Sequence, residues 1–385
     1  MKVVLSTLGK FHTFDLAREL QRRDALTALF TGYPRFKLKS EAIPLHLIRT
    51  FPWVHGLYMA VAGRLKLNAG LMRQWEWFDR ISLDRHVAGM LPECDVFVGL
   101  SSSALITGRT ARSRGARYVC DRGSTHIRVQ DRLLKEEHAR WGVPFAGIDP
   151  RIVEREEAEY SEADCITVPS AFNVESFLSQ GVPAAKVHKL PYGVDVANFR
   201  PTAQPDTSRF DVLFAGAMSI RKGVPDLLHA YQRLKHPRKT LTFAGAVDLR
   251  LIERMKALKL WPGEVRILGH LPQSKLRDLM SVSHVLVLPS LEEGLAMVQA
   301  QAMACACPVV ASAHTGASDL FSDGVEGFIV PVRAPQLMAD RLQQLADQPE
   351  LRRSMAHRAR LRVEELGGWS TYGNQAYSLY EELAA

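Results

Sequence analysis

The sequence lacks long hydrophobic runs: no stretch approaches 18 uninterrupted apolar residues, so no membrane-spanning helix is predicted. The first residues, MKVVLSTLGKFHTF, contain an apolar run too short for the core of a signal peptide. Low-complexity tracts and clear internal repeats are also absent, which excludes solenoid and fibrous classes. We therefore predict a cytoplasmic protein and leave open a peripheral position on the inner face of the cell membrane.

Cysteine is scarce, with five residues in a chain of 385. An odd number of scattered cysteines does not form a disulfide framework and suits a reducing compartment. Cys305 and Cys307 are one residue apart, which is not the spacing of a redox or zinc pair, so we interpret them as buried small hydrophobes. An Asp-x-Asp metal motif is also missing, so we expect neither a divalent cation nor another cofactor.

Acidic residues are outnumbered, and the formal net charge is +8 with a pI of about 9.3. The segment from Tyr33 to Arg80 has eight Lys or Arg against three acids, mixed with seven Phe, Trp or Tyr side chains after Tyr33. This mixture suits shallow docking on an anionic membrane surface. The alternative is a solvated basic helix pair whose aromatic side chains lie in the core. No nucleic-acid-binding motif is visible, so no nucleic acid partner is predicted.

Apolar strands alternate with amphipathic helices along the whole chain, the rhythm of a parallel sheet covered on both faces. The polar, proline-containing stretch FRPTAQPDTS separates two such series. We predict an α/β protein with two Rossmann-like, doubly wound domains that face each other across a cleft. The predicted boundaries are 1–198 for the first domain, 199–366 for the second domain and 367–385 for a final helix. Ligands of such sheets bind at the carboxyl ends of the strands.

Two cations follow the first strand of the second series, in the stretch AGAMSIRKGVPDLLHAY. The strand ends at Gly216, and Arg221 and Lys222 stand beside Gly223 just before a helix that begins near Pro225. Cations beside a flexible glycine at a strand end and a helix start favour a diphosphate site. The alternative is a pair of solvated loop cations.

A second site candidate lies in PSLEEGLAMVQAQAMACACPVVAS, residues 289–312. A buried strand ends before it, and we expect a helix from about Leu295 whose free N–H groups favour an anion. Glu293 stands just before this helix start, where its carboxylate could accept hydrogen bonds from sugar hydroxyls. An equally good interpretation from local sequence is a helix-capping acid.

These stretches together resemble the GT-B glycosyltransferases of family 4. Residues 289–312 are similar to the family's donor signature, and GAMSIRKG is similar to its phosphate loop. The segment ending in PYGVDVANFRP resembles the family's interdomain segment, HTGASDLFSDGVEGFIVPV its late donor loop, and GWSTYGNQAYSLYEEL its last helix. These motifs stand in the family's order, which makes the resemblance specific, and it spans most of the chain. The resemblance implies that 1–198 form an acceptor-binding domain, that 199–366 form a nucleotide-sugar-binding domain and that the helix of 367–385 crosses back to the first domain.

The resemblance implies a role for each matching residue. Lys222 would neutralise the diphosphate with help from Arg221, and Glu293 would contact the donor sugar. Backbone N–H groups at Gly294, Leu295 and Ala296 would hold phosphate or sugar oxygens, and Gln301 would bind the ribose. The implied donor-binding residues are Gly9, Lys10, His12, Gly216, Arg221, Lys222, Gly223, Gly269, Glu293, Gly294, Leu295, Ala296 and Gln301; the implied catalytic residues are His126, Glu293 and Lys222. Asp121 and Arg122 share the loop of His126 and are weaker candidates.

Two positions depart from the family pattern. Ala217 replaces the arginine that usually follows the first glycine of the phosphate loop, and Arg221 could reach the same phosphates from another direction. Gln301 replaces the second glutamate of the donor signature. An amide keeps two hydrogen bonds to a ribose diol but loses charge assistance of roughly 1–2 kcal/mol, on the order of tenfold in affinity.

The predicted function is therefore a retaining, metal-independent glycosyltransferase. It would move a sugar from a nucleoside-diphosphate sugar to a saccharide or lipid-linked acceptor, in cell-envelope polysaccharide or glycolipid synthesis. The departures at Ala217 and Gln301 keep open a non-catalytic sugar-nucleotide-binding relative that acts as a partner or regulator. A phosphorylase or a non-hydrolysing epimerase of the same fold is a third possibility, against which the Glu293–Gly294 context argues.

Overall fold

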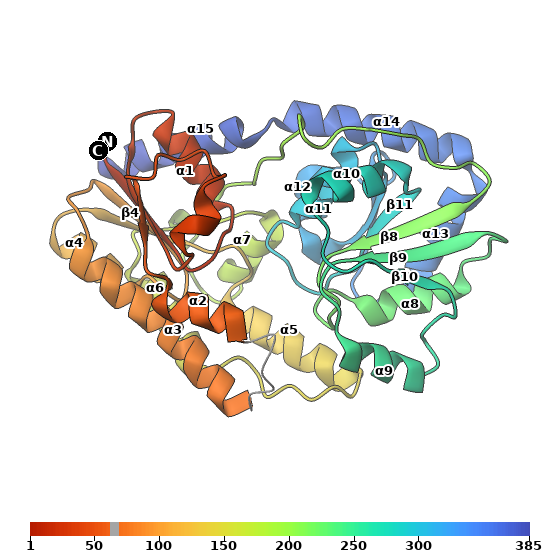
Figure 1. The fold of residues 1–385 in the computed structure, drawn as a ribbon, viewed down its shortest axis with the longest axis horizontal. Coiled ribbons are helices and arrows are strands. Elements are labelled where there is room, and N and C mark those ends of the chain that lie inside the picture. The colour runs from red at the N-terminus through yellow and green to blue at the C-terminus, as the bar shows by residue number, and fades with distance from the viewer. Residues whose placement is uncertain (62–68) are drawn as a thin grey trace.

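The computed structural model describes residues 1–61 and 69–385 and contains two parallel sheets, each in its own domain (Figure 1). The first sheet has the order β3-β2-β1-β4-β5-β6-β7, and the second has the order β10-β9-β8-β11-β12-β13. Helices cover both faces, which confirms the predicted pair of doubly wound domains. None of the helices within the described ranges has the length and apolarity needed to cross a membrane.

The first sheet is built from short, apolar strands that are buried on both faces, as in the fully buried β1 sequence VVLST. Its strands are β1 (Val3–Thr7), β2 (Leu26–Thr31), β3 (Ile48–Thr50), β4 (Val96–Leu100), β5 (Arg117–Asp121), β6 (Cys165–Val168) and β7 (Val187–Lys189). Its helices are α1 (Thr13–Gln21), α2 (Pro52–Val61), α3 (Ala69–Met90), α4 (Leu105–Ser113), α5 (Ile127–Arg140), α6 (Pro150–Glu162) and α7 (Ala171–Leu178), with 3-10 turns at Arg35–Leu38 and Ala184–Lys186.

The second sheet repeats the same construction, with the wholly buried VLVL of β11 at its centre. Its strands are β8 (Phe210–Ala215), β9 (Lys239–Ala244), β10 (Val265–Ile267), β11 (Val285–Leu288), β12 (Val309–Ser312) and β13 (Gly327–Val330). Its helices are α8 (Val224–Arg233), α9 (Leu249–Ala257), α10 (Gln273–Val282), α11 (Met297–Ala304), α12 (Ala317–Leu320), α13 (Pro335–Asp347) and α14 (Pro349–Leu366), with a 3-10 turn at Ala313–Thr315.

The chain returns to the first domain through its last helix, α15 (Trp369–Ala384), which lies against α1 (Figure 1). Tyr372, Ala376 and Tyr380 of α15 join the core formed by β1 and α1. Both chain crossings between the domains meet at Gly193, where an added Cβ would lie 2.4 Å from the Trp369 nitrogen. Only glycine allows two backbones to approach this closely.

Candidate active site

A cleft of about 2420 Å³ separates the domains and is lined by residues of both. Because β1, β8 and β11 end at this cleft, it collects the loops that follow the carboxyl ends of the central strands. Five of the predicted donor residues line it: Gly9, Lys10, His12, Arg221 and Gln301. The Gln301 side chain makes no hydrogen bond to the described residues and is therefore available to a ligand.

Arg221 and Lys222 meet the acidic pair that follows β11. Arg221 Nη1 lies 3.4 Å from a carboxylate oxygen of both Glu292 and Glu293, and Lys222 is ion-paired with Glu293. Arg221 is the more accessible cation, since 36% of its side chain is exposed against 16% for Lys222. Burial alone would lower the pKa of Arg221, but the two carboxylates outweigh it and raise that pKa. The two cations predicted from sequence therefore lie together, and both Arg221 and Lys222 already form ion pairs with Glu293.

Gly223 explains how the two loops come so close. Its φ is +67°, and an added Cβ would lie 2.0 Å from the Pro289 carbonyl oxygen, so both the backbone and the contact require glycine. The Leu291 N–H also donates to the Arg221 carbonyl at 2.8 Å. Gly216 and Gly269 have positive φ as well and hold the neighbouring turns, but neither is among the cleft-lining residues in the described ranges.

The start of α11 differs from the expectation. The helix begins at Met297, two residues later than predicted, and the Ala296 N–H donates to the Thr315 carbonyl at 3.2 Å. Because that donor is already used inside the protein, the structure gives no support to the predicted contact of Ala296 with phosphate or sugar oxygens. Gly294 and Leu295 are buried beside it, and an added Cβ at Gly294 would lie 2.2 Å from the Gly123 carbonyl oxygen of the other domain. This loop is therefore held by tertiary contacts on both sides.

Glu292 joins the two walls of the cleft. Its fully buried carboxylate accepts hydrogen bonds from the Thr125 N–H and hydroxyl at 3.0 Å, from Gln130 at 2.9 Å and from the Ser124 hydroxyl. Burial alone would raise the pKa of Glu292, but Arg221 and these donors lower it below its usual value. Sequence analysis missed this contact: the adjacent acids were a signal, but the partner loop lies 167 residues away.

His126 is not one of the described residues that line the cleft. Its ring packs against Tyr160 and Phe177 at centroid distances of 4.9 and 5.1 Å, and its Nδ1 caps α5 by accepting the Arg128 N–H. Burial lowers its pKa to about 4. Its position gives no support to the predicted catalytic role.

His12 occupies the cleft wall instead. Its Nε2 lies 2.6 Å from Oδ2 of Asp121, at the end of β5, and its ring stacks on Tyr192 at 4.2 Å. Arg122 also lines the cleft and pairs with Glu156 at 3.0 Å. The structure therefore brings Asp121 and Arg122 to the site, although both were only secondary candidates from sequence.

The basic, aromatic segment has two faces. His55, Tyr58, Arg73 and Arg80 line the cleft from α2 and α3. On the other side, large apolar side chains are exposed one or two helical turns apart: Trp53 (72% exposed) and Leu57 on α2, and Leu71 and Phe78 on α3. The alternative that the aromatic side chains all lie in the core is wrong for Trp53 and Phe78. Arg64 and Lys66 lie outside the described residues.

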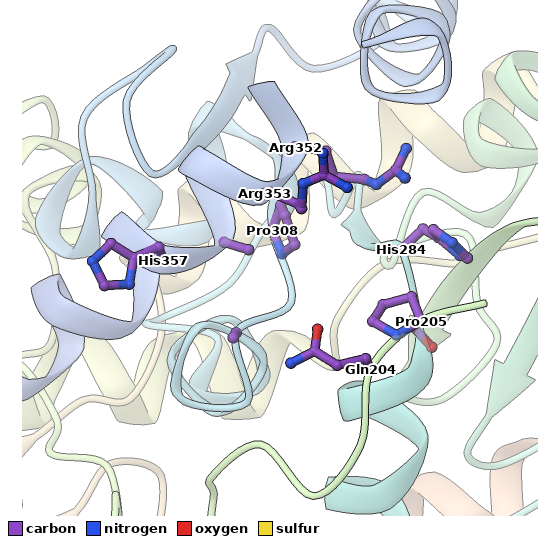
Figure 2. Close-up of a pocket in the computed structure, with 10 residues that line it drawn as sticks. Gln204, Pro205, His284, Pro308, Arg352, Arg353 and His357 are labelled. Carbon is purple, nitrogen blue, oxygen red and sulfur yellow. The ribbon is translucent and has the colours of Figure 1, made fainter. Parts of the chain in front are cut away.

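A second hollow, of about 300 Å³, lies beside the amino ends of β11 and β12, where His284 and Pro308 line it (Figure 2). Arg352, Arg353 and His357 of α14 and His284 surround it. His284 accepts the Asp211 N–H and reaches the Asp206 carbonyl, Arg352 donates to the Leu345 carbonyl, and Arg353 is paired with Glu350. These pairings leave little capacity for a ligand, and the hollow is far from the loops described above.

Within residues 1–61 and 69–385, no three His, Cys, Asp or Glu side chains gather in a metal-binding arrangement. The expected independence of metal remains a prediction.

Residues 195–362 match the family described as glycosyl transferases group 1. The chain is 28% identical over 224 residues to the alpha-maltose-1-phosphate synthase of Mycolicibacterium smegmatis. The matched region covers 52% of this chain and 58% of the synthase. It is 28% identical over 326 residues to D-inositol 3-phosphate glycosyltransferase 1 of Catenulispora acidiphila, covering 77% and 75%. The chain thus spans little more than half the length of the synthase and of several other curated relatives.

Two solved structures match over the full length. A sucrose-phosphate synthase from Thermosynechococcus elongatus superposes with a TM-score of 0.74 at 19% identity, covering 100% of this chain and 99% of that one. Anabaena HepE in complex with UDP and glucose gives a TM-score of 0.73 at 16% identity, covering 99% and 100%. These likenesses show the GT-B fold.

Proposed function

We propose that this protein transfers a sugar from a nucleoside-diphosphate sugar to a saccharide or lipid-linked acceptor, because residues 195–362 match the family of group 1 glycosyl transferases. The observation that carries the proposal is the position of Arg221 in the interdomain cleft, with Lys222 directly beside it. The proposal includes retention at the anomeric carbon, no metal requirement and a role in cell-envelope polysaccharide or glycolipid synthesis.

Electrostatic stabilisation of the leaving diphosphate would supply the main catalytic effect. Arg221 is reachable from the cleft, and Lys222 lies behind it in an ion pair with Glu293. A diphosphate that draws Lys222 away from Glu293 would free that carboxylate for the hydroxyls of the donor sugar. Gln301, whose amide is unpaired among the described residues, is the proposed ribose ligand.

The proposed acceptor is lipid-linked because of the two-faced hairpin of α2 and α3. The face that lines the cleft carries mainly polar side chains together with Met59 and Met72. Trp53, Leu57, Leu71 and Phe78 are exposed and are not among the residues that line it. Exposed Arg35, Lys37 and Lys39 lie in and beside the nearby 3-10 turn. Apolar side chains beside cations favour an anionic bilayer surface, which would present the acceptor at the cleft.

We expect calorimetry without metal to detect selective binding of one nucleotide among UDP, GDP, ADP, CMP and dTDP. UDP is tested first, since HepE was solved with it. Gln301→Glu is expected to bind about tenfold more tightly, because a carboxylate restores charge-assisted hydrogen bonds to the ribose. Turnover of the corresponding NDP-sugar with an acceptor extract then tests transfer. Binding without turnover for any donor would favour the non-catalytic partner or regulator, and no binding at all would contradict the proposal.

We also expect the protein to sediment with vesicles of phosphatidylglycerol but not with phosphatidylcholine vesicles. The double variant Trp53→Ser/Leu57→Ser should reduce bound protein at least about fivefold, since each residue loses apolar burial worth more than 1 kcal/mol. The matched control is Leu249→Ser/Leu361→Ser, which removes two exposed leucines of the second domain. Equal losses in both variants would contradict docking through α2.

A further inference from the structure

Two cations of the cleft differ from all the others that line it. Besides Arg73 and Arg80, the Lys and Arg side chains along the cleft in the described ranges are Lys10, Arg18, Arg22, Arg122 and Arg221. Each of those five forms an ion pair with a glutamate. Within residues 1–61 and 69–385, the hydrogen bonds of Arg73 and Arg80 go only to neutral oxygens, and neither side chain forms an ion pair. Their charge is therefore not neutralised by direct contact with a carboxylate.

Arg73 and Arg80 lie on the face of α3 that meets the cleft. They are seven residues apart, which places them two helical turns, or about 10 Å, apart along the same side of the helix. Arg73 Nη2 donates to the Gly147 carbonyl at 2.8 Å. Arg80 donates from Nε to the Ser102 hydroxyl at 3.0 Å and from Nη1 to the Glu76 carbonyl at 3.1 Å.

These neutral contacts hold both side chains and leave most of their donors unused. A guanidinium has five N–H groups, of which Arg73 uses one and Arg80 uses two among the described residues. The planar guanidinium matches the oxygens of a phosphate group, to which it can donate two parallel hydrogen bonds. The pair is therefore suited to an anion with several oxygens.

The carboxylates nearby have other partners. Glu76 stands between the two arginines along α3, and its Oε1 accepts the Tyr58 hydroxyl at 2.8 Å. Solvent weakens the repulsion between an anion and a carboxylate that it does not touch, whereas a direct hydrogen bond from a charged donor is strong. The arginines therefore outweigh Glu76, which lowers the affinity for the anion without preventing its binding. The other two acids are paired as well: Asp79 with His55 at 2.7 Å and Asp149 with Arg151 at 2.6 Å.

Apolar side chains beside the two arginines indicate which kind of phosphate fits. Met72, next to Arg73 in the chain, and Met59 of α2 line the same cleft. The flexible side chain of methionine adapts to an irregular apolar group such as a hydrocarbon chain. Phe78 is 59% exposed and lies about 200° around α3 from Arg80, on the side proposed to dock on a bilayer. One helix thus presents cations to the cleft and an apolar side chain to the membrane surface.

We propose that Arg73 and Arg80 hold the phosphate or diphosphate that links the acceptor saccharide to its lipid; this inference rests on the proposed function. No bond forms or breaks at this subsite. It positions the acceptor by its charged group on the first domain, while Arg221 and Lys222 hold the diphosphate of the donor on the second. A water-soluble sugar phosphate carries the same phosphate ester, so the test separates the two sources.

The test measures sedimentation with phosphatidylcholine vesicles that contain either undecaprenyl phosphate or phosphatidylglycerol at equal surface charge. Arg73→Gln/Arg80→Gln should reduce binding to the undecaprenyl phosphate vesicles at least about tenfold, because two charge-assisted contacts are lost. Binding to the phosphatidylglycerol vesicles should stay within about twofold of wild type, since both side chains face the cleft. The matched control is Arg128→Gln/Arg132→Gln, which removes two exposed cations of α5 and should bind both vesicles like wild type.

Glu76→Gln is expected to have the opposite effect. The amide oxygen still accepts the Tyr58 hydroxyl, but the like charge between the arginines is gone, so binding to undecaprenyl phosphate vesicles should tighten about two- to fivefold. A purely structural role of this part of α3 predicts no gain. Glucose 1-phosphate, titrated by calorimetry, is the soluble probe. If it binds through Arg73 and Arg80 while the two kinds of vesicle are bound alike, the subsite takes a soluble phosphate ester.

The inference is overturned if Arg73→Gln/Arg80→Gln binds both phosphate probes as wild type does, or if it loses both kinds of vesicle equally. Should that variant not fold, Glu76→Gln carries the test, and the absence of any gain overturns the inference. Nucleotide binding separates this result from the proposed function, because the second domain should bind its nucleotide equally in all these variants. Wild type without nucleotide binding would contradict the proposed function and leave the vesicle comparison intact.

Discussion

Lys222→Met is expected to lower kcat/KM for the donor on the order of 10²–10³-fold. The substitution keeps the length and apolar stem of the side chain but removes the charge that would balance the leaving diphosphate, and one lost donor of this kind typically has that effect. Steady-state kinetics with the donor at several concentrations measures it. The loss should appear mainly in kcat, because the diphosphate gains charge as the bond to the sugar breaks.

A loss of activity in Lys222→Met could also come from the broken ion pair with Glu293, and this cause must be distinguished from the lost charge at the diphosphate. The Glu293 carboxylate is 9% exposed. Without Lys222 it would retain, among the described residues, only the cation of Arg221 at 3.4 Å. The double variant Lys222→Met/Glu293→Gln removes this stranded charge. If the double variant recovers activity, the lysine serves Glu293 and not the diphosphate. Lys189→Met is the matched control, because Lys189 forms a similar pair with Asp319 at 2.7 Å away from the cleft, and it should leave kcat unchanged.

Glu292→Ala is expected to destabilise the contact between the domains by about 3–5 kcal/mol, the usual result of removing one partner of a buried charged cluster. The substitution leaves Arg221 short of a partner and strands the donors of Ser124, Thr125 and Gln130. We expect a Tm lower by roughly 5–10 °C and a larger radius of gyration in X-ray scattering. Glu136→Gln is the control: it weakens a half-exposed interdomain pair with Arg333 and should change Tm little.

The same carboxylate gives a pH signature. The pKa of Glu292 is lowered in the folded protein from an ordinary value of 4.5, so its contribution is complete above that value and is lost as pH falls through the folded pKa. The Tm difference between wild type and Glu292→Gln should therefore be largest near about pH 7 and should close as the pH falls through the lowered pKa of Glu292. A difference that stays constant over this range would contradict the role of the ionised carboxylate.

Much of this architecture could be predicted from the sequence because it depends on patterns within short segments of the chain. Short buried strands such as VVLST and VLVL, each followed by an amphipathic helix, predict two parallel sheets, and parallel sheets place their ligands at the strand ends. The placing of Arg221 and Lys222 at a strand end could be predicted because a strand, a glycine and a helix start surround them in the sequence. The prediction for α8 was close, since the helix begins at Val224.

Contacts between distant segments could not be predicted in the same way. The residues next to His12 and His126 in the sequence do not reveal their partners; only the tertiary structure shows that His12 meets Asp121 and that His126 meets Tyr160 and Phe177. The start of α11 moved for a related reason. The Ala296 N–H was expected to be a free helix-terminal donor, but a loop nineteen residues later supplies its acceptor at Thr315.

The position of α15 has a consequence for biosynthesis. Val3, Leu5 and Phe14 leave the ribosome before the second domain does, but their core is closed by Tyr372, Ala376 and Tyr380. The first domain therefore keeps an uncovered apolar surface while the whole second domain is translated, and the second domain can reach its native state first. The growing chain is a natural client for chaperones during that interval, because exposed apolar surface in a partly folded chain promotes aggregation.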